Sequence, residues 1–275
     1  VKIAIKAASG STLTNTTKVD LVRQLKKYNV ASVRPEIVDP ETTSIILTTN
    51  VKFDQNSANK TADTLKSDIL TTLTNYNTNT LTQFDGVFRY SKVTGLIDNT
   101  DSSILSNITT LKIRKDFTPT LTVSSKYNVY FRNSLHNPHS GHNSAAGGIL
   151  ESSGFKVSGD SSTVFYLDDD GVGNVRRYSF SGATRVYTAS DQGTIDYDTG
   201  SITINSLSVL SVENIRGEAS SKIELTVVPS SNDVVPVRDQ ILEIDTANSS
   251  ITVTADTFVG GSSDAGVGYT TTSSY

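Results

Sequence analysis

Cysteine, methionine and tryptophan are all missing from the 275 residues of the chain. Because there is no cysteine, the chain can form no disulfide bond and no thiolate metal site, and it has no thiol nucleophile. This composition fits assembly in a reducing cytosol. Since methionine is absent even from position 1, we expect that Val1 is not the natural start and that the sequence is a piece of a longer protein.

Three further features are absent, and each argues against a class of function. No apolar run approaches the roughly 20 residues of a membrane-spanning helix, and no signal peptide is visible. The net charge of −4 is spread along the chain, so no basic patch predicts a nucleic-acid partner. The remaining composition is ordinary for a soluble protein, with 36% hydrophobic and 19% charged residues. The length predicts about two domains.

The stretch 43–113 has the clearest periodicity in the chain. Residues 45–53 place mostly apolar side chains at every second position, which predicts a half-buried strand. Residues 88–97 predict a helical segment, and the alternation at 108–113 predicts a closing strand. Between the first strand and 88–97 we expect a long helix, because apolar residues recur there at steps of four, four and three: Leu65, Ile69, Leu73 and Tyr76.

Residues 1–38 repeat this order on a smaller scale, with an expected strand at each end and a short helix between them. The second strand contains Pro35, which favours an edge position. Followed by 43–113, the order strand, helix, strand, strand, helix, strand is typical of a split β-α-β, ferredoxin-like fold. We therefore assign residues 1–117 to such a domain. The helical stripe within 1–38 consists of Leu21, Leu25 and Tyr28.

Past residue 117, short apolar runs alternate with turn-forming residues. Residues 195–204 form a hairpin by residue type, because Asp and Gly supply a tight turn, and residues 244–253 repeat this plan less closely. Such strands predict a mostly antiparallel sandwich or barrel over 118–258. Residues 259–275 are rich in Gly, Ser and Thr and predict an arm without its own core. The fold class expected for the whole chain is α+β.

The three histidines of the chain, His136, His139 and His142, lie three residues apart. A helix could direct such a trio at one metal ion. Pro138 and Gly141 disfavour a helix here, however, and no carboxylate lies close by to orient the rings. A polar interaction loop is the better interpretation.

Acidic and glycine-rich segments give no firmer site. Residues 168–174 begin with three aspartates but lack the spacing and the downstream Glu of an EF-type calcium loop, which favours an exposed hairpin tip. Neither this segment nor 146–148 follows a strand and opens a helix, as a phosphate-binding loop does. No G-x-S-x-G motif occurs. The sequence therefore predicts no catalytic residue, metal ion, cofactor or small-molecule substrate.

Several segments together resemble one family. The stretch 40–117 is similar to the baseplate J-like proteins of contractile phage tails. The similarity runs to about Thr257 and identifies the chain as resembling the C-terminal portion of the large wedge subunit of T-even-type phage baseplates. The residues that resemble this subunit are, in order, 88–92, 145–150 with 154–157, and 232–238.

This resemblance implies a structural role in the virion, in the tail baseplate, after assembly in the host cytoplasm. Such subunits pair as homodimers and link into a ring around the central hub, which holds the wedges together and rearranges when the tail contracts. The implied partners are further copies of the chain, other wedge proteins and the hub. The family has no catalytic residues to carry over.

Two segments are expected at or near subunit contacts, because both are long, glycine-rich and without an apolar face: the loop 133–148 and the tail after Val259. One alternative function is a receptor-binding or tail-fibre module, which would normally show fibrous repeats or an aromatic groove. Another is a glycan-cleaving tail enzyme, which needs two carboxylates about 5 to 9 Å apart in a cleft. The candidate interface residues are Asn133, His136, His139, His142, Gly147, Gly148, Val259, Tyr269 and Tyr275.

Overall fold

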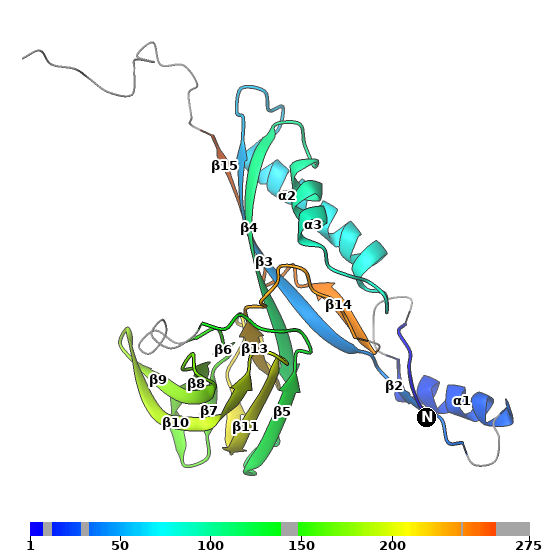
Figure 1. The fold of residues 1–275 in the computed structure, drawn as a ribbon, viewed down its shortest axis with the longest axis vertical. Helices are drawn as coiled ribbons and strands as arrows, with labels where there is room; N and C mark the ends of the chain where they lie inside the picture. Colours follow the sequence, from blue (N-terminus) through cyan, green and yellow to red (C-terminus); the bar gives the residue numbers. More distant parts are fainter. Residues whose placement is uncertain (8–12, 29–32, 139–147, 238, 257–275) are drawn as a thin grey trace, which may run out of the picture.

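The computed structural model is elongated and has three parts (Figure 1). A helix-covered arm extends to one end, a curled sheet lies beside its base, and a small N-terminal unit projects from the other side. The fold is α+β, as the sequence predicts, with three α-helices, a mixed sheet and an antiparallel half-barrel in the described residues. The structure describes residues 1–7, 13–28, 33–138, 148–237 and 239–256.

The mixed sheet is built on two long antiparallel strands whose residues alternate between a covered and an open face. Ile45, Leu47 and Val51 are fully buried, which confirms the strand expected at 45–53. In hydrogen-bonded order the strands are β14 (Gln240–Ile244), β3 (Glu41–Phe53), β4 (Ile104–Phe117), β13 (Ile223–Val227) and β6 (Glu151–Ser152), with β15 (Ser250–Ala255) beside the second half of β3.

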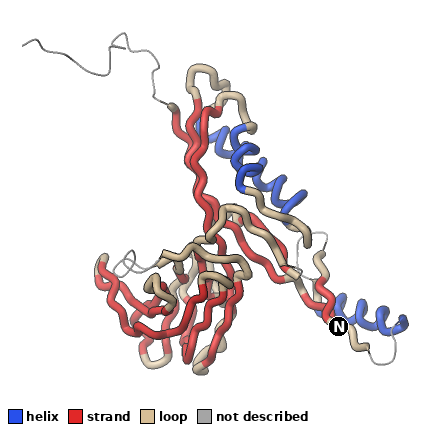
Figure 2. Tube along the Cα trace, in the orientation of Figure 1, coloured by secondary structure: helices blue, strands red, loops and turns tan. Residues whose placement is uncertain are grey.

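Helices α2 (Ala62–Tyr76) and α3 (Tyr90–Asp98) lie along one side of the arm (Figure 2). Thr61 caps α2, because its side chain accepts a hydrogen bond from the Thr64 N–H. A π-helical turn, η2 (Asn77–Leu81), follows α2. The predicted stripe is confirmed at its first three positions, since these side chains are fully buried: Leu65, Ile69 and Leu73.

The ferredoxin-like prediction is wrong. The strands β1 (Lys2–Ala4) and β2 (Glu36–Val38) pair in parallel with each other, in a two-stranded sheet separate from β3 and β4. The helix α1 (Asn15–Leu25) and the 3-10 turn η1 (Lys26–Tyr28) connect them. A three-residue strand offers few hydrogen bonds, whereas β3 and β4 are long enough to form their own sheet and attract strands from later in the chain.

The second sheet has seven strands and is antiparallel throughout. The mostly antiparallel prediction for 118–258 is therefore confirmed for these strands, but β13, β14 and β15 of the same range join the mixed sheet, where β14 and β15 pair in parallel with β3. Strand β11 continues into β12 directly after Ser208, and Ser206 has a φ of 49° at the bend. One bent segment therefore lies near both ends of the pairing order, and the sheet curls into a half-barrel. The order is β12 (Val209–Val212), β7 (Phe155–Val157), β8 (Asp160–Asp169), β9 (Asn174–Ser181), β10 (Thr184–Asp196), β11 (Ser201–Leu207) and β5 (Ser125–Tyr130).

The two predicted hairpins have different outcomes. The hairpin at 195–204 is confirmed, because Ile195 lies opposite Ile202 across β10 and β11. The hairpin plan at 244–253 is wrong, since β14 and β15 both pair in parallel with β3 and not with each other. Asp245 donates its N–H to the Ile45 carbonyl, and the Ser249 hydroxyl accepts from the N–H of Leu47. These bonds keep the turn on the edge of β3, so the chain continues in the same direction.

The mixed sheet takes strands from both sides of residue 117, because β13, β14 and β15 lie at 223–255. The domain boundaries 1–117, 118–258 and 259–275 stay predictions, and the last segment lies almost wholly outside the described residues. In the part of the chain that the structure describes, no helix has the length and apolar character needed to cross a membrane.

Candidate interaction surfaces

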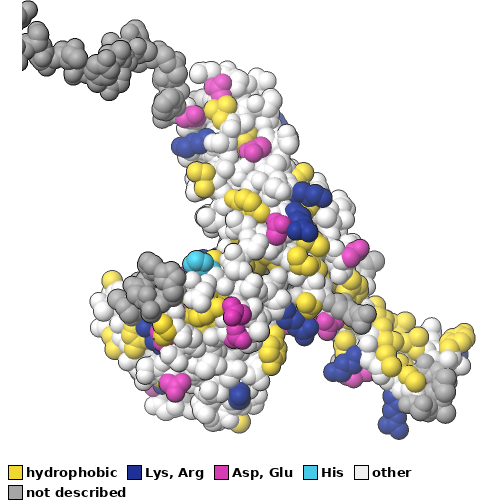
Figure 3. Space-filling view, in the orientation of Figure 1, with side chains coloured by type: hydrophobic (Ala, Val, Ile, Leu, Met, Phe, Trp, Pro, Cys, Tyr) yellow, Lys and Arg dark blue, Asp and Glu magenta, His cyan; other side chains and the backbone are white. Residues whose placement is uncertain are grey.

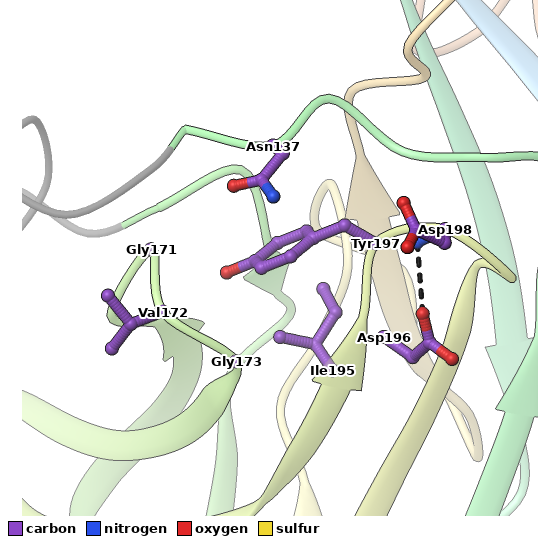
Figure 4. Close-up of a pocket in the computed structure, with 8 residues that line it drawn as sticks. All are labelled: Asn137, Gly171, Val172, Gly173, Ile195, Asp196, Tyr197 and Asp198. Carbon is purple, nitrogen blue, oxygen red and sulfur yellow. Dashed lines mark hydrogen bonds between the residues drawn. The ribbon is translucent and has the colours of Figure 1, made fainter.

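The half-barrel carries a pocket between two of its turns (Figure 4). One wall is the turn 170–173 between β8 and β9, and the other is the turn 197–200 between β10 and β11. Glycine allows both turns, because three glycines have φ values that other residues rarely adopt: Gly171 at 78°, Gly173 at 107° and Gly200 at 67°. The pocket has a volume of about 530 Å³ and is lined by Asn137, Gly171, Val172, Gly173, Ile195, Asp196, Tyr197 and Asp198.

Asp169 holds the two walls of this pocket together. Its carboxylate is fully buried and accepts hydrogen bonds from the Tyr197 hydroxyl at 2.6 Å, the Leu150 N–H at 2.8 Å and the Gly171 N–H at 3.2 Å. Burial, followed by the bond to Asp169, raises the pKa of Tyr197 well above its usual value. The hydroxyl therefore stays protonated and continues to donate to Asp169.

Asp168 lies on the face of the sheet opposite to that of Asp169, and it connects the strands β8, β9 and β10. Its carboxylate is fully buried and forms two hydrogen bonds with Arg176, at 3.0 and 3.2 Å. It also accepts hydrogen bonds from Arg185 and from the Tyr187 hydroxyl, each at 2.8 Å. A carboxylate so fully paired is suited to fixing strands rather than to moving a proton. The predicted hairpin at 168–174 is present, but its first two aspartates are buried and not exposed.

The rim of the pocket combines acidic and apolar groups. Asp196 and Asp198 are exposed, and hydrogen bonds from Thr199 lower the pKa of Asp196, so it is charged at neutral pH. Val172 is 58% exposed at the other wall. This combination fits a ligand that carries both positive charge and apolar surface.

A second polar hollow, of about 390 Å³, lies where the arm meets the lower part of the mixed sheet. Arg114 forms ion pairs there with Asp116 at 2.9 Å, Glu224 at 3.2 Å and Asp245. Lys115 is 4% exposed and pairs with Glu41; burial lowers the pKa of this lysine. Arg114, Lys115, Asp116 and Glu41 of this hollow are already engaged in ion pairs, so they join neighbouring strands of the mixed sheet. Across the described residues, no three His, Cys, Asp or Glu side chains are placed to hold a metal ion.

The N-terminal unit, residues 1–38, presents the largest uncovered apolar surface that Figure 3 shows. Among its described residues, Pro35 and Ile37 are buried. Three apolar side chains are strongly exposed: Val1 at 72%, Val19 at 64% and Tyr28 at 88%. Tyr28 was expected on the helical stripe, but it lies in the 3-10 turn after α1 and faces outward.

The structure describes three of the nine predicted interface residues. The side chain of Asn133 accepts a hydrogen bond from the Val235 N–H at 3.3 Å, which anchors the start of its loop. His136 is exposed, and its N–H donates to the Val228 carbonyl. Gly148 lies so close to the Asp169 carboxylate that a side chain would collide with it. The other six lie outside the described residues: His139, His142, Gly147, Val259, Tyr269 and Tyr275.

The buried aspartate network was missed from the sequence. The signal was present, because the hairpin register places Asp168 opposite Arg176, so two charges of opposite sign meet across neighbouring strands. The depth of burial could not be predicted, because it depends on further groups that converge on the two aspartates: Arg185 and Tyr187 on Asp168, and Leu150 and Tyr197 on Asp169.

Known proteins match two segments of the chain, the N-terminal unit and the helix-covered arm. Residues 1–38 match the family model of the baseplate structural protein gp6, C-terminal domain I, and residues 42–116 match that of C-terminal domain III. A curated relative, the baseplate wedge protein gp6 of Enterobacteria phage T4, is 28% identical over 129 residues. Two segments of the chain are therefore similar to C-terminal domains I and III of a baseplate structural protein, with a distant match to the phage T4 wedge protein. The sequence resemblance is thereby confirmed, as is the location in the phage baseplate, a part of the virion.

The gp6 alignment covers 46% of this chain and 20% of the relative, so the chain spans about a fifth of the relative's length. The segment that matches C-terminal domain I is the projecting N-terminal unit. The matched part of domain III is the arm formed by β3, α2, α3 and β4.

Proposed function

We propose that this chain is a self-associating, non-enzymatic part of the baseplate. It pairs as a homodimer and links into a ring that joins the wedges around the central hub and rearranges when the tail contracts. Its partners are further copies of itself, other wedge proteins and the hub, and assembly takes place in the host cytoplasm. The match to a family of structural baseplate proteins supports this function over a receptor-binding module or a glycan-cleaving enzyme.

The observation that carries the proposal is the uncovered apolar surface of the N-terminal unit (Figure 3). Soluble monomers rarely expose large contiguous apolar patches, and such patches mark protein contacts. Here the patch lies on a segment that matches a domain of a structural baseplate protein. An assembly would cover it, whereas a monomer leaves it in water.

Sedimentation velocity and electron microscopy of the purified chain test this function. We expect linked dimers and larger closed assemblies whose population rises with protein concentration. A chain that stays monomeric at every concentration would contradict the proposal.

The loop 133–148 and the tail after Val259 are proposed to lie at or near these contacts. The anchoring of Asn133 supports the loop, because it fixes the point from which the loop leaves the half-barrel. Deletion of residues 260–275, followed by light scattering, tests the tail. We expect weaker self-association, and unchanged association would count against a contact there.

A further inference from the structure

The described residues of the N-terminal unit form no core of their own, since only Pro35 and Ile37 among them are buried. Its sheet has two strands of three residues each, and an isolated two-stranded sheet is marginal in water without further cover. No residue of α1 is buried, whereas α2 buries three. The half-covered apolar side chains of the unit include Ile3, Ile5, Leu21, Val22 and Leu25. The unit therefore needs a partner surface.

Charge is distributed unevenly between this unit and the rest of the chain. Residues 1–38 contain seven Lys or Arg and two Asp or Glu, a net charge of +5. Since the whole chain carries −4, residues 39–275 carry −9. The last turns of α1 and η1 concentrate the positive charge, with Arg23, Lys26 and Lys27 all exposed. Next to them lies the exposed ring of Tyr28.

This charge distribution decides between two ways of covering the apolar surface. A two-fold contact between two N-terminal units would bring two charges of +5 together, and such like-charge contacts are costly. A contact between the unit of one copy and the acidic part of the next brings opposite charges together. Such a head-to-tail contact uses two different surfaces and extends into a ring when the rotation closes.

The pocket of Figure 4 offers an acidic surface of a kind that complements the basic tip of α1. It offers two exposed carboxylates, Asp196 and Asp198, on one wall and the exposed apolar side chain of Val172 on the other. It lies on the half-barrel, away from the projecting N-terminal unit (Figure 1), so the unit and pocket of one chain are separated. We propose that the tip of α1, with Lys26, Lys27 and Tyr28, docks in this pocket of a second copy of the chain. This proposal rests on the self-association proposed above.

The chain contains no cysteine, which permits a direct test with single introduced thiols in the full chain. Mixed Lys27→Cys and Asp198→Cys chains should form a disulfide-linked heterodimer under mild oxidation. A matched control is Lys27→Cys mixed with Glu218→Cys, because Glu218 is also an exposed acid but lies on the loop between β12 and β13. Equal cross-linking to both positions would overturn the proposal, as would linkage of Lys27→Cys only to itself.

Charge variants give an independent test by sedimentation velocity. Lys26→Glu with Lys27→Glu, and separately Asp198→Lys, should each weaken self-association by roughly tenfold, and combining them in one chain should restore it. Glu218→Lys should leave it unchanged. The association should also weaken with salt, since charges are screened beyond about 10 Å at 0.1 M ionic strength.

The outcomes separate this contact from the proposed function. A wild-type chain that self-associates, with α1 and pocket variants that behave like the control, would overturn the docking contact and leave the assembly role standing. A wild-type chain that stays monomeric at every concentration would overturn both. Association only with a different baseplate protein would show that another partner covers α1, and this too would overturn the contact.

Discussion

The N-terminal unit and the arm are both helix-on-sheet structures, but they differ in how much each helix covers. In the arm, α2 packs on β15 and α3 packs on β4. The two helices bury five side chains completely: Leu65, Ile69, Leu73, Val93 and Ile97. In the N-terminal unit, α1 buries none of its side chains, and its sheet has two short strands. Helical stability in water comes mainly from the packing of an amphipathic face. The arm therefore stabilises itself, while the N-terminal unit depends on contacts from outside it.

Strand length explains much of this difference. The strands β3 and β4 have 13 and 14 residues, so they can pair with each other and with three further strands, β13, β14 and β15. Two three-residue strands provide no such platform. The four predictions below test the contrast, from the largest expected effect to the smallest.

The largest loss of stability is expected for Asp168→Ala in the half-barrel. Like the arm, the half-barrel is stabilised by contacts between its own buried side chains. This substitution leaves Arg176 buried without its carboxylate, and breaking a buried ion pair from one side costs about 3–5 kcal/mol. Urea denaturation of the full chain measures the change. Asp170→Ala is the control, with a loss of about 1 kcal/mol, because Asp170 mainly accepts hydrogen bonds in the turn. Equal losses for both variants would contradict the role given to Asp168.

Leucine-to-alanine variants in the two helices compare the regions directly. Leu73→Ala in α2 should lower the free energy of unfolding by about 3 kcal/mol, because a fully buried leucine leaves a cavity. Leu21→Ala in α1 should lower it by less than about 1 kcal/mol in the isolated chain, because Leu21 is only half-buried. The same urea experiment measures both. A larger loss for Leu21→Ala would mean that the N-terminal unit has a core after all.

Hydrogen exchange should separate the same two regions without any substitution. We expect the amides of β1 to exchange far faster than those at the centre of β3, because local opening is easiest where few apolar contacts are buried. Mass spectrometry of the full chain at low concentration measures the rates. At high concentration, where copies associate, protection of β1 should increase. Slow exchange of β1 at both concentrations would contradict the contrast.

The smallest effect concerns Glu224, which forms an ion pair with Arg114. Burial raises the pKa of Glu224 above its ordinary value, so the folded chain binds this proton more tightly than the unfolded chain. Stability from this group is therefore present below the ordinary pKa and declines as the pH rises through the raised value. Glu224→Gln should remove the decline and raise the melting temperature at neutral pH by no more than about 2 °C. A difference between the variant and the wild type that does not change with pH would contradict this assignment.

The sequence predicted those elements in which one strong period continues over several turns or residues. The stripe Leu65, Ile69 and Leu73 and the alternation in 45–53 were read correctly, because each period matches its own secondary structure. The hairpin at 195–204 could be predicted from the sequence, since its Asp and Gly residues favour the turn. The turn at 245–249 contains similar residues but does not reverse the chain, because its hydrogen bonds go to β3.

The candidate surfaces were less predictable. Asp168 and Asp169 appeared as an exposed tip, because a sequence window does not show that Arg176, Arg185 and Tyr197 converge on them. The uncovered face of α1 also escaped prediction. Its apolar stripe is ordinary in the sequence, and only the shortness of the neighbouring strands leaves it exposed.

The sequence alone determined the local elements, the α+β class and the resemblance to a baseplate wedge subunit, because periodicity and residue type act over short stretches of chain. The tertiary structure decided which strands share a sheet, which acids are buried and which helix remains uncovered. These properties arise from contacts between segments far apart in the chain, such as β3 with β14 and β15. No local pattern encodes the partner of a strand or the cover of a helix.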